Sequence, residues 1–204
     1  MEIVIFQLII LLFSAVIHEV SHGFVADYLG DPTARNAGRL TLNPLKHLEV
    51  FGSFILPLSL FFISSGSFIF GWAKPVPYNP LNLKKPERDG GLIAAAGPLS
   101  NFLIAVVLGI LYRILLGLDL VAPNFLNLLS IIVLINLMLM VFNLVPLPPL
   151  DGSKVLFALL PKGAYQIINL LSQYGMFLLL VFIFFGFQFI IPVVFLLYRL
   201  IIGS

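Results

Sequence analysis

Long apolar runs alternate with short polar segments along this chain, and their lengths predict its elements. A helix that crosses a membrane needs about 20 mainly apolar residues. Four stretches meet that need, at residues 1–29, 91–116, 125–142 and 172–202. The last is long for one straight helix, and Gly186 and Pro192 are points at which it can divide in two. The pattern predicts an all-α polytopic membrane protein with one or two C-terminal helices.

A fifth apolar stretch, residues 51–70, is interrupted by glycine, proline and a Ser-Ser-Gly-Ser run. The loops on both sides of it, 30–50 and 71–90, are rich in Lys and Arg, whereas loop 117–124 has neither. Cytoplasmic loops are enriched in these residues. Residues 51–70 are therefore predicted to form a re-entrant or short hairpin with both ends in the cytoplasm. The alternative is an ordinary span with one basic outer loop.

This arrangement predicts a multi-pass protein of the cell membrane with its N-terminus outside. Residues 1–29 and 125–142 then run inward, and residues 91–116 run outward. A final segment broken into two short helices would return Arg199 to the cytoplasm.

Composition supports a membrane protein, because 60% of the 204 residues are apolar and only 10% are charged. A net charge of +2 gives no sign of a nucleic-acid partner. No linker, repeat or low-complexity tract divides the chain, so residues 1–204 are expected to form a single integral-membrane domain without an appended sensor or peptide-binding module. The first apolar run lacks a basic start, and we expect it to be retained rather than removed as a signal peptide.

The first predicted helix contains a metal-binding pattern, His18-Glu19-Val20-Ser21-His22. Residues four apart lie on one face of a helix, so both imidazoles can reach one ion, while Glu19 is offset and can act on a water. Ionisable residues at membrane depth are costly and are read as functional. The alternative is a pair of hydrogen-bonded histidines with a glutamate paired to a cation. The pattern predicts a catalytic metal site.

Catalytic zinc typically takes three protein ligands, so one more is needed. The absence of cysteine excludes thiolate ligands, disulfides and a cysteine nucleophile. His47 lies in a basic loop and is predicted to be solvated. Asp151 follows a proline-rich stretch, residues 143–150, at the cytoplasmic end of a predicted span, and Gly152 permits close approach or a positive φ. Asp151 is therefore the predicted third ligand; the alternative is an N-cap for a helix at 154–160.

At these residues the chain resembles the site-2 protease family of intramembrane metalloproteases. Residues 18–22 match the family's zinc-binding helix, and residues 143–152 match its Asn-x-x-Pro-x-x-Pro-Leu-Asp-Gly element. Residues 97–101 look like its Gly-Pro-x-x-Asn element, and residues 71–77 look like a compact bacterial subgroup. The resemblance implies a three-helix catalytic core, one Zn²⁺ per chain, and hydrolysis of peptide bonds within or beside the membrane.

The resemblance also implies roles for individual residues. His18, His22 and Asp151 would hold the zinc, and Glu19 would be the general base that activates the water and then protonates the leaving nitrogen. The implied partners are the lipid bilayer and a membrane-embedded or membrane-adjacent protein substrate, whose backbone would be held by two asparagines. These are Asn101 and Asn143. The alternative for both amides is hydrogen bonding between helices.

Two other functions are compatible with the same fold. A catalytically silent binding protein would keep the metal ligands, but an intact Glu19 argues against it. A zinc transporter would need ionisable residues at several depths, whereas here they gather at one level. An extended edge within residues 51–77 is a further candidate contact for a substrate strand. Its alternative is an anchor at the membrane interface.

Overall fold

The computed structural model describes residues 2–49, 55, 59, 62, 74–118, 121–161 and 163–203, and these residues are mainly helical, without a strand among them. The α-helices are α1 (Glu2–Tyr28), α2 (Thr33–Asn36), α4 (Pro86–Leu118), α5 (Pro123–Asn143), α6 (Asp151–Leu159), α7 (Tyr165–Val181) and α8 (Ile190–Ile202). Short 3-10 turns are η1 (Pro44–Lys46), η3 (Pro80–Asn82) and η5 (Phe187–Phe189), and η4 (Phe182–Gly186) is a π-helical turn. The predicted hairpin at residues 51–70 lies outside the described residues except for positions 55, 59 and 62.

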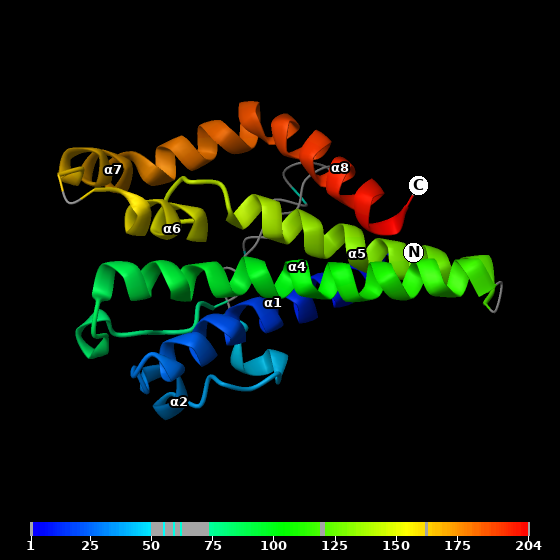
Figure 1. The fold of residues 1–204 in the computed structure, drawn as a ribbon, viewed down its shortest axis with the longest axis horizontal. Helices are drawn as coiled ribbons and strands as arrows, with labels where there is room; N and C mark the ends of the chain where they lie inside the picture. The colour runs from blue at the N-terminus through cyan, green and yellow to red at the C-terminus, as the bar shows by residue number, and fades with distance from the viewer. Residues whose placement is uncertain are drawn as a thin grey trace.

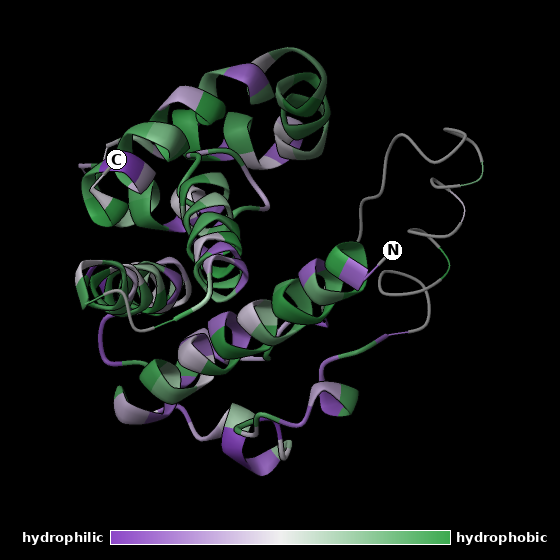
Figure 2. Ribbon diagram, turned by 90° about the vertical axis from the view of Figure 1, so that its right-hand side faces the viewer, coloured by the Kyte–Doolittle hydropathy of each residue, from purple (hydrophilic) through white to green (hydrophobic). Residues whose placement is uncertain are grey.

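Four helical stretches are long and apolar enough to cross a membrane, at Glu2–Tyr28, Pro86–Leu118, Pro123–Asn143 and Tyr165–Ile202. Figure 2 shows these long helices coloured mostly as hydrophobic, with hydrophilic residues frequent in the short helices and loops. Large apolar side chains such as Phe184 and Phe185 are 74% and 73% exposed, as lipid-facing residues would be. The prediction of an all-α polytopic membrane protein is confirmed.

Helix α4 is the centre of the bundle, because α1, α5, α6 and α8 all pack against it (Figure 1). Glycines set two of these contacts. A Cβ at Gly109 would lie 2.1 Å from Ile201 of α8, and a Cβ at Gly91 would lie 2.3 Å from Ala158 of α6. Small residues let membrane helices approach closely, which is why α4 can serve several neighbours.

The last span crosses the bundle once, which corrects the prediction that it returns Arg199 to the starting side. Figure 1 shows α7 and α8 following one another along the bundle, with a bend between them. Phe187 stacks near Phe142 at the C-terminal end of α5, and the Arg113 side chain near the C-terminal end of α4 donates to the carbonyl of Leu200. Of the two alternatives, one helix or two, the structure has two α-helices, α7 and α8, joined by η4 and η5, which bend the chain without reversing it. Pro192 lies in the first turn of α8, where an N–H is dispensable.

The segments on either side of residues 51–70 meet at one end of the bundle, where α1 ends and α4 begins. The Lys74 amide donates to the His47 carbonyl at 2.8 Å, and Arg39 donates to the Lys74 carbonyl at 2.7 Å. The Asp31 carboxylate accepts from the Asn79 amide at 2.6 Å and from the Asn82 side chain at 2.7 Å. These contacts hold residues 74–82 against the end of α1.

Candidate active site

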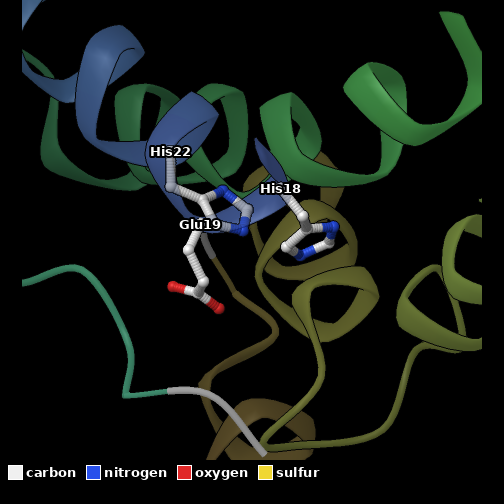
Figure 3. A group of neighbouring side chains, drawn as sticks. All are labelled: His18, Glu19 and His22. Atoms are coloured by element: carbon white, nitrogen blue, oxygen red, sulfur yellow. The ribbon is translucent and has the colours of Figure 1, made fainter. Parts of the chain in front are cut away.

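Helix α1 supplies the first part of the site from two successive turns. His18 is buried, Glu19 and His22 are half-buried, and Figure 3 shows the three side chains projecting from neighbouring positions of α1. The two imidazole rings are edge-to-face with centroids 4.7 Å apart. Each of the three residues brings one ligand atom within 4.8 Å of the others, so the group could hold a metal ion.

Asp151, which is 133 residues after His18 in the sequence, lies beside the same two imidazole rings. Its Oδ2 lies 3.0 Å from His18 Nε2 and 3.2 Å from His22 Nε2. Asp151 is the first residue of α6 and no side chain caps that helix, so the alternative of an N-cap for a helix at 154–160 is wrong.

The other nitrogen of each imidazole faces an oxygen. His18 Nδ1 lies 2.6 Å from Asn101 Oδ1, and His22 Nδ1 lies 2.6 Å from the Ile93 carbonyl. Such oxygens only accept, so each neutral ring carries its proton on Nδ1 and leaves Nε2 bare. Two nitrogen lone pairs and a carboxylate oxygen then converge and repel one another unless a cation lies among them. This donor set fits a divalent metal whose histidine ligands are oriented by outer hydrogen bonds.

Gly97 of α4 leaves the space that these donors face. A Cβ at this position would lie 2.5 Å from both His18 Nε2 and His22 Nε2. The sequence motif at residues 97–101 singled Gly97 out without indicating this role, since the contact depends on how α1 crosses α4. Gly152 is explained by close approach, since a Cβ there would lie 2.2 Å from the Leu144 carbonyl. The positive-φ glycines among the described residues are elsewhere, at positions 30, 38 and 203.

A cavity of about 170 Å³ opens beside the three donors and Glu19. One wall is the non-helical segment 74–79, whose residues Pro75, Val76 and Tyr78 line the cavity. Lys154 of α6 also lines it, with Nζ 5.4 Å from the Tyr78 ring centroid. The Val76 amide donates to Glu19 Oε2 at 2.9 Å. Sequence reasoning placed Val76 in a motif but gave no sign of this bond. Tyr78 and Lys154 carried no sequence signal.

The remaining predicted residues lie in three different settings. Asn143 lines the cavity, and its Nδ2 donates to the Leu139 carbonyl at 2.9 Å. Asn101 is fully buried between helices and bonds His18, so the structure gives its amide no contact with the cavity. The prediction that His47 is solvated is wrong. Its side chain is buried where Thr41 and Lys74 fold over it, with Nε2 2.8 Å from the Thr41 carbonyl, and it lies outside the group of metal donors.

Comparison with known proteins gives several matches. The family model described as "Peptidase family M50" matches residues 113–185. "Putative zinc metalloprotease YwhC" of Bacillus subtilis is 38% identical over 182 residues, which are 86% of this chain and 78% of the relative. "Putative zinc metalloprotease Rip2" of Mycolicibacterium smegmatis is 29% identical over 173 residues, covering 83% of this chain and 63% of the relative. "Zinc metalloprotease MJ0392" of Methanocaldococcus jannaschii is 36% identical over 107 residues, covering 51% of this chain and 30% of the relative. No solved structure matches.

All three relatives are named zinc metalloproteases, and the donor set in this structure suits the same metal. The cofactor is therefore zinc. The match to the relative from Bacillus subtilis extends over most of both chains. The chain belongs to peptidase family M50, the site-2 protease family.

Proposed function

We propose that this protein is an intramembrane zinc metalloendopeptidase that hydrolyses peptide bonds of membrane-embedded or membrane-adjacent proteins. The observation that carries the proposal is the convergence of His18 Nε2, His22 Nε2 and Asp151 Oδ2 within 3.2 Å contacts, beside a glutamate on a cavity. In this proposal the three converging side chains are the zinc ligands. Glu19 is the general base.

Bound zinc supplies a Lewis acid that activates water and polarises the substrate carbonyl. Glu19 takes the proton from the attacking water and delivers it to the leaving nitrogen as the peptide bond breaks. The Val76 amide holds one carboxylate oxygen of Glu19 at 2.9 Å, which orients the other for proton transfer. A backbone amide is well suited to this task, because the donor is fixed by the main chain of segment 74–79 and cannot rotate away as a side-chain donor can.

The substrate is proposed to enter as an unwound segment, because a helical segment keeps its backbone groups in internal hydrogen bonds. The cavity wall formed by residues 74–79 is itself non-helical, and Asn143 also lines the cavity with an amide that can donate and accept. We propose that these two features hold the substrate backbone. By the distribution of Lys and Arg, this end of the bundle is proposed to face the cytoplasm, with the N-terminus outside.

The test separates an enzyme from a silent binding protein and from a transporter. Glu19→Gln should keep zinc and lose cleavage by about 10²- to 10⁴-fold, because an amide cannot accept the water's proton. Cleavage is measured as fragments released from membrane proteins reconstituted with the enzyme, and proteomics of membrane fragments with wild type and Glu19→Gln identifies the substrates. A Glu19→Gln variant with full cleavage would remove Glu19 from the reaction.

The ligand assignment is tested by metal content. Asp151→Ala should lose zinc, whereas His47→Ala is the matched control, since His47 is buried but lies outside the donor group. The assignment fails if Asp151→Ala retains zinc and His47→Ala releases it. A transporter would instead move zinc across vesicle membranes, with transport that persists in Glu19→Gln.

A further inference from the structure

A line of buried hydrogen bonds leads from α5 through α4 to the ring of His18. Asn136 Nδ2 donates to the Ile132 carbonyl at 2.9 Å, and Asn101 Nδ2 donates to Asn136 Oδ1 at 3.0 Å. Asn101 Oδ1 in turn lies 2.6 Å from His18 Nδ1. Both asparagines are fully buried, so each amide atom depends on protein partners rather than on water.

The direction of this line is fixed by two backbone carbonyls, which can only accept. The Ile132 carbonyl requires the NH₂ group of Asn136, which turns Asn136 Oδ1 toward Asn101. The Ser14 carbonyl lies 3.5 Å from Asn101 Nδ2, so it too must be faced by an NH₂ group, here that of Asn101. The atom of Asn101 that faces His18 is therefore the oxygen, and the ring proton must lie on Nδ1.

A reversed amide would produce a different site. With the NH₂ group of Asn101 against His18 Nδ1, the ring proton would move to Nε2, which lies 3.0 Å from Asp151 Oδ2. His18 would then donate to Asp151, and this hydrogen bond would occupy two of the three zinc donors. His22 needs no such control from side chains, because its Nδ1 faces the backbone carbonyl of Ile93.

We propose that Asn136 is a positioning residue for the zinc site, acting through Asn101 to hold His18 in the Nδ1–H tautomer with Nε2 free for the metal. The inference rests on the proposed function, since it takes His18 as a ligand. Asn136 is 7 residues before the Asn-x-x-Pro element that begins at Asn143, and no sequence motif points to it. Asn136 does not line the cavity, and its side chain bonds Asn101 and the Ile132 carbonyl, so it acts on His18 through the Asn101 amide.

The experiment compares two substitutions of Asn136 in the full chain, purified in detergent. Asn136→Leu removes the acceptor. Asn136→Asp keeps it, because a neutral carboxyl group can donate to the Ile132 carbonyl and accept from Asn101. Val133→Ala is the matched control, a fully buried position one turn earlier on α5 that packs in the apolar core. Zinc affinity is measured by competition with a chelator, and the ring tautomers by ¹⁵N NMR of histidine-labelled, metal-free protein, in which only three histidines give signals.

Asn136→Leu should weaken zinc binding by about 10- to 100-fold and shift His18 toward the Nε2–H tautomer. Asn136→Asp and Val133→Ala should both stay near wild type in affinity and tautomer. The proposal is overturned if Asn136→Leu keeps both wild-type values, if Val133→Ala weakens zinc as much, or if Asn136→Asp behaves like Asn136→Leu. Metal-free wild type with His18 as Nε2–H would also overturn it, even if no variant folds. Zinc affinity unchanged in His18→Ala would instead refute the proposed ligand set.

Discussion

At the scale of single residues, the candidate site depends on side chains that converge and on a glycine that leaves space for them. His18, Glu19 and His22 follow a spacing that a helix converts into one face, and Asp151 stands out at the end of a proline-rich stretch. Gly97 matters because it has no side chain. A motif cannot show this role, since it depends on where the two imidazole rings of another helix, α1, lie. For Asn101, the motif leaves open a contact with substrate or a hydrogen bond between helices, because it cannot show which way the amide faces; in the structure the amide bonds His18 and Asn136.

Gly97→Ala should therefore disable the site although it changes no donor. The added methyl group would lie 2.5 Å from both His18 Nε2 and His22 Nε2, so the rings must move or the metal position is filled. We expect loss of zinc and of cleavage with the helices intact. Metal analysis and circular dichroism of the purified variant check this expectation.

Gly117→Ala is the matched control on the same helix, because a Cβ there meets nothing within 4 Å. Replacing glycine by alanine in a helix favours folding by about 1 kcal/mol, so this variant should bind zinc normally and be slightly more stable. Normal zinc content in Gly97→Ala would show that the donors are less crowded than the structure indicates.

At the scale of elements, helices were easier to predict than the connections that complete the site. The predicted start of the second span at residue 91 was late, because α4 begins at Pro86 with Glu87 and Asp89 in its first turn. Proline and acidic residues suit a helix start, although they lower the hydropathy used to find a span. Segment 74–79 has no periodic pattern, and its place beside Glu19 depends on Arg39 and Asp31, which are distant in sequence.

Asp31 should make the attachment of this segment depend on pH. Burial raises the pKa of its carboxyl. Hydrogen bonds from Thr33, Asn82 and Asn79 lower the pKa by more than burial raises it, so the net pKa is below the ordinary 3.8. A lowered pKa stabilises the folded state at pH values above 3.8, and this contribution is lost as the pH falls through the folded pKa. Neutral and mildly acidic conditions should therefore leave the segment attached.

Hydrogen exchange at the Asn79 amide, which bonds Asp31 Oδ2, provides the measurement. Protection should be constant from neutral pH down to about pH 4 and should fall below it, since hydrogen bonds to charged groups contribute about 2 kcal/mol each. Asp31→Asn should exchange faster at neutral pH and show little further change in acid. Equal protection in wild type and Asp31→Asn at pH 7 would contradict the role given to this carboxylate.

For the whole molecule, the number of long helices was predictable from hydropathy, but the path of the last span was not. Hydropathy locates apolar stretches without showing whether a glycine ends a helix or bends it. Packing decides here, because Gly109 and Arg113 of α4 receive the far end of α8. The ends of α4 and α8 therefore lie together, away from the zinc donors.

Cysteine labelling of this naturally cysteine-free chain tests that arrangement. Single cysteines at Asn36, Lys84, Gly117 and Arg199 replace exposed residues. An impermeant reagent applied to intact cells should label positions 117 and 199 and spare positions 36 and 84, because the first pair lies at the outer end and the second at the basic, cytoplasmic end. If the cysteine at position 36 is labelled and the cysteine at position 84 is not, the two loops lie on opposite sides of the membrane, which would contradict their contact in the structure. If the cysteine at position 117 is labelled and the cysteine at position 199 is not, the final segment returns to the cytoplasmic side and the single crossing is wrong.

The distance in sequence between the donors has a consequence for the order in which the protein is made. His18 and its partner Asp151 are 133 residues apart, and Asn101 lies 83 residues after His18. During synthesis, the first helix therefore enters the membrane long before its metal partners exist. The two imidazoles have no hydrogen-bond acceptors for their Nδ1–H groups until α4 has been made, and no carboxylate beside them until α6 has been made. A nascent chain cannot bring these side chains together, so under the proposed function cleavage would require most of the chain to have been inserted.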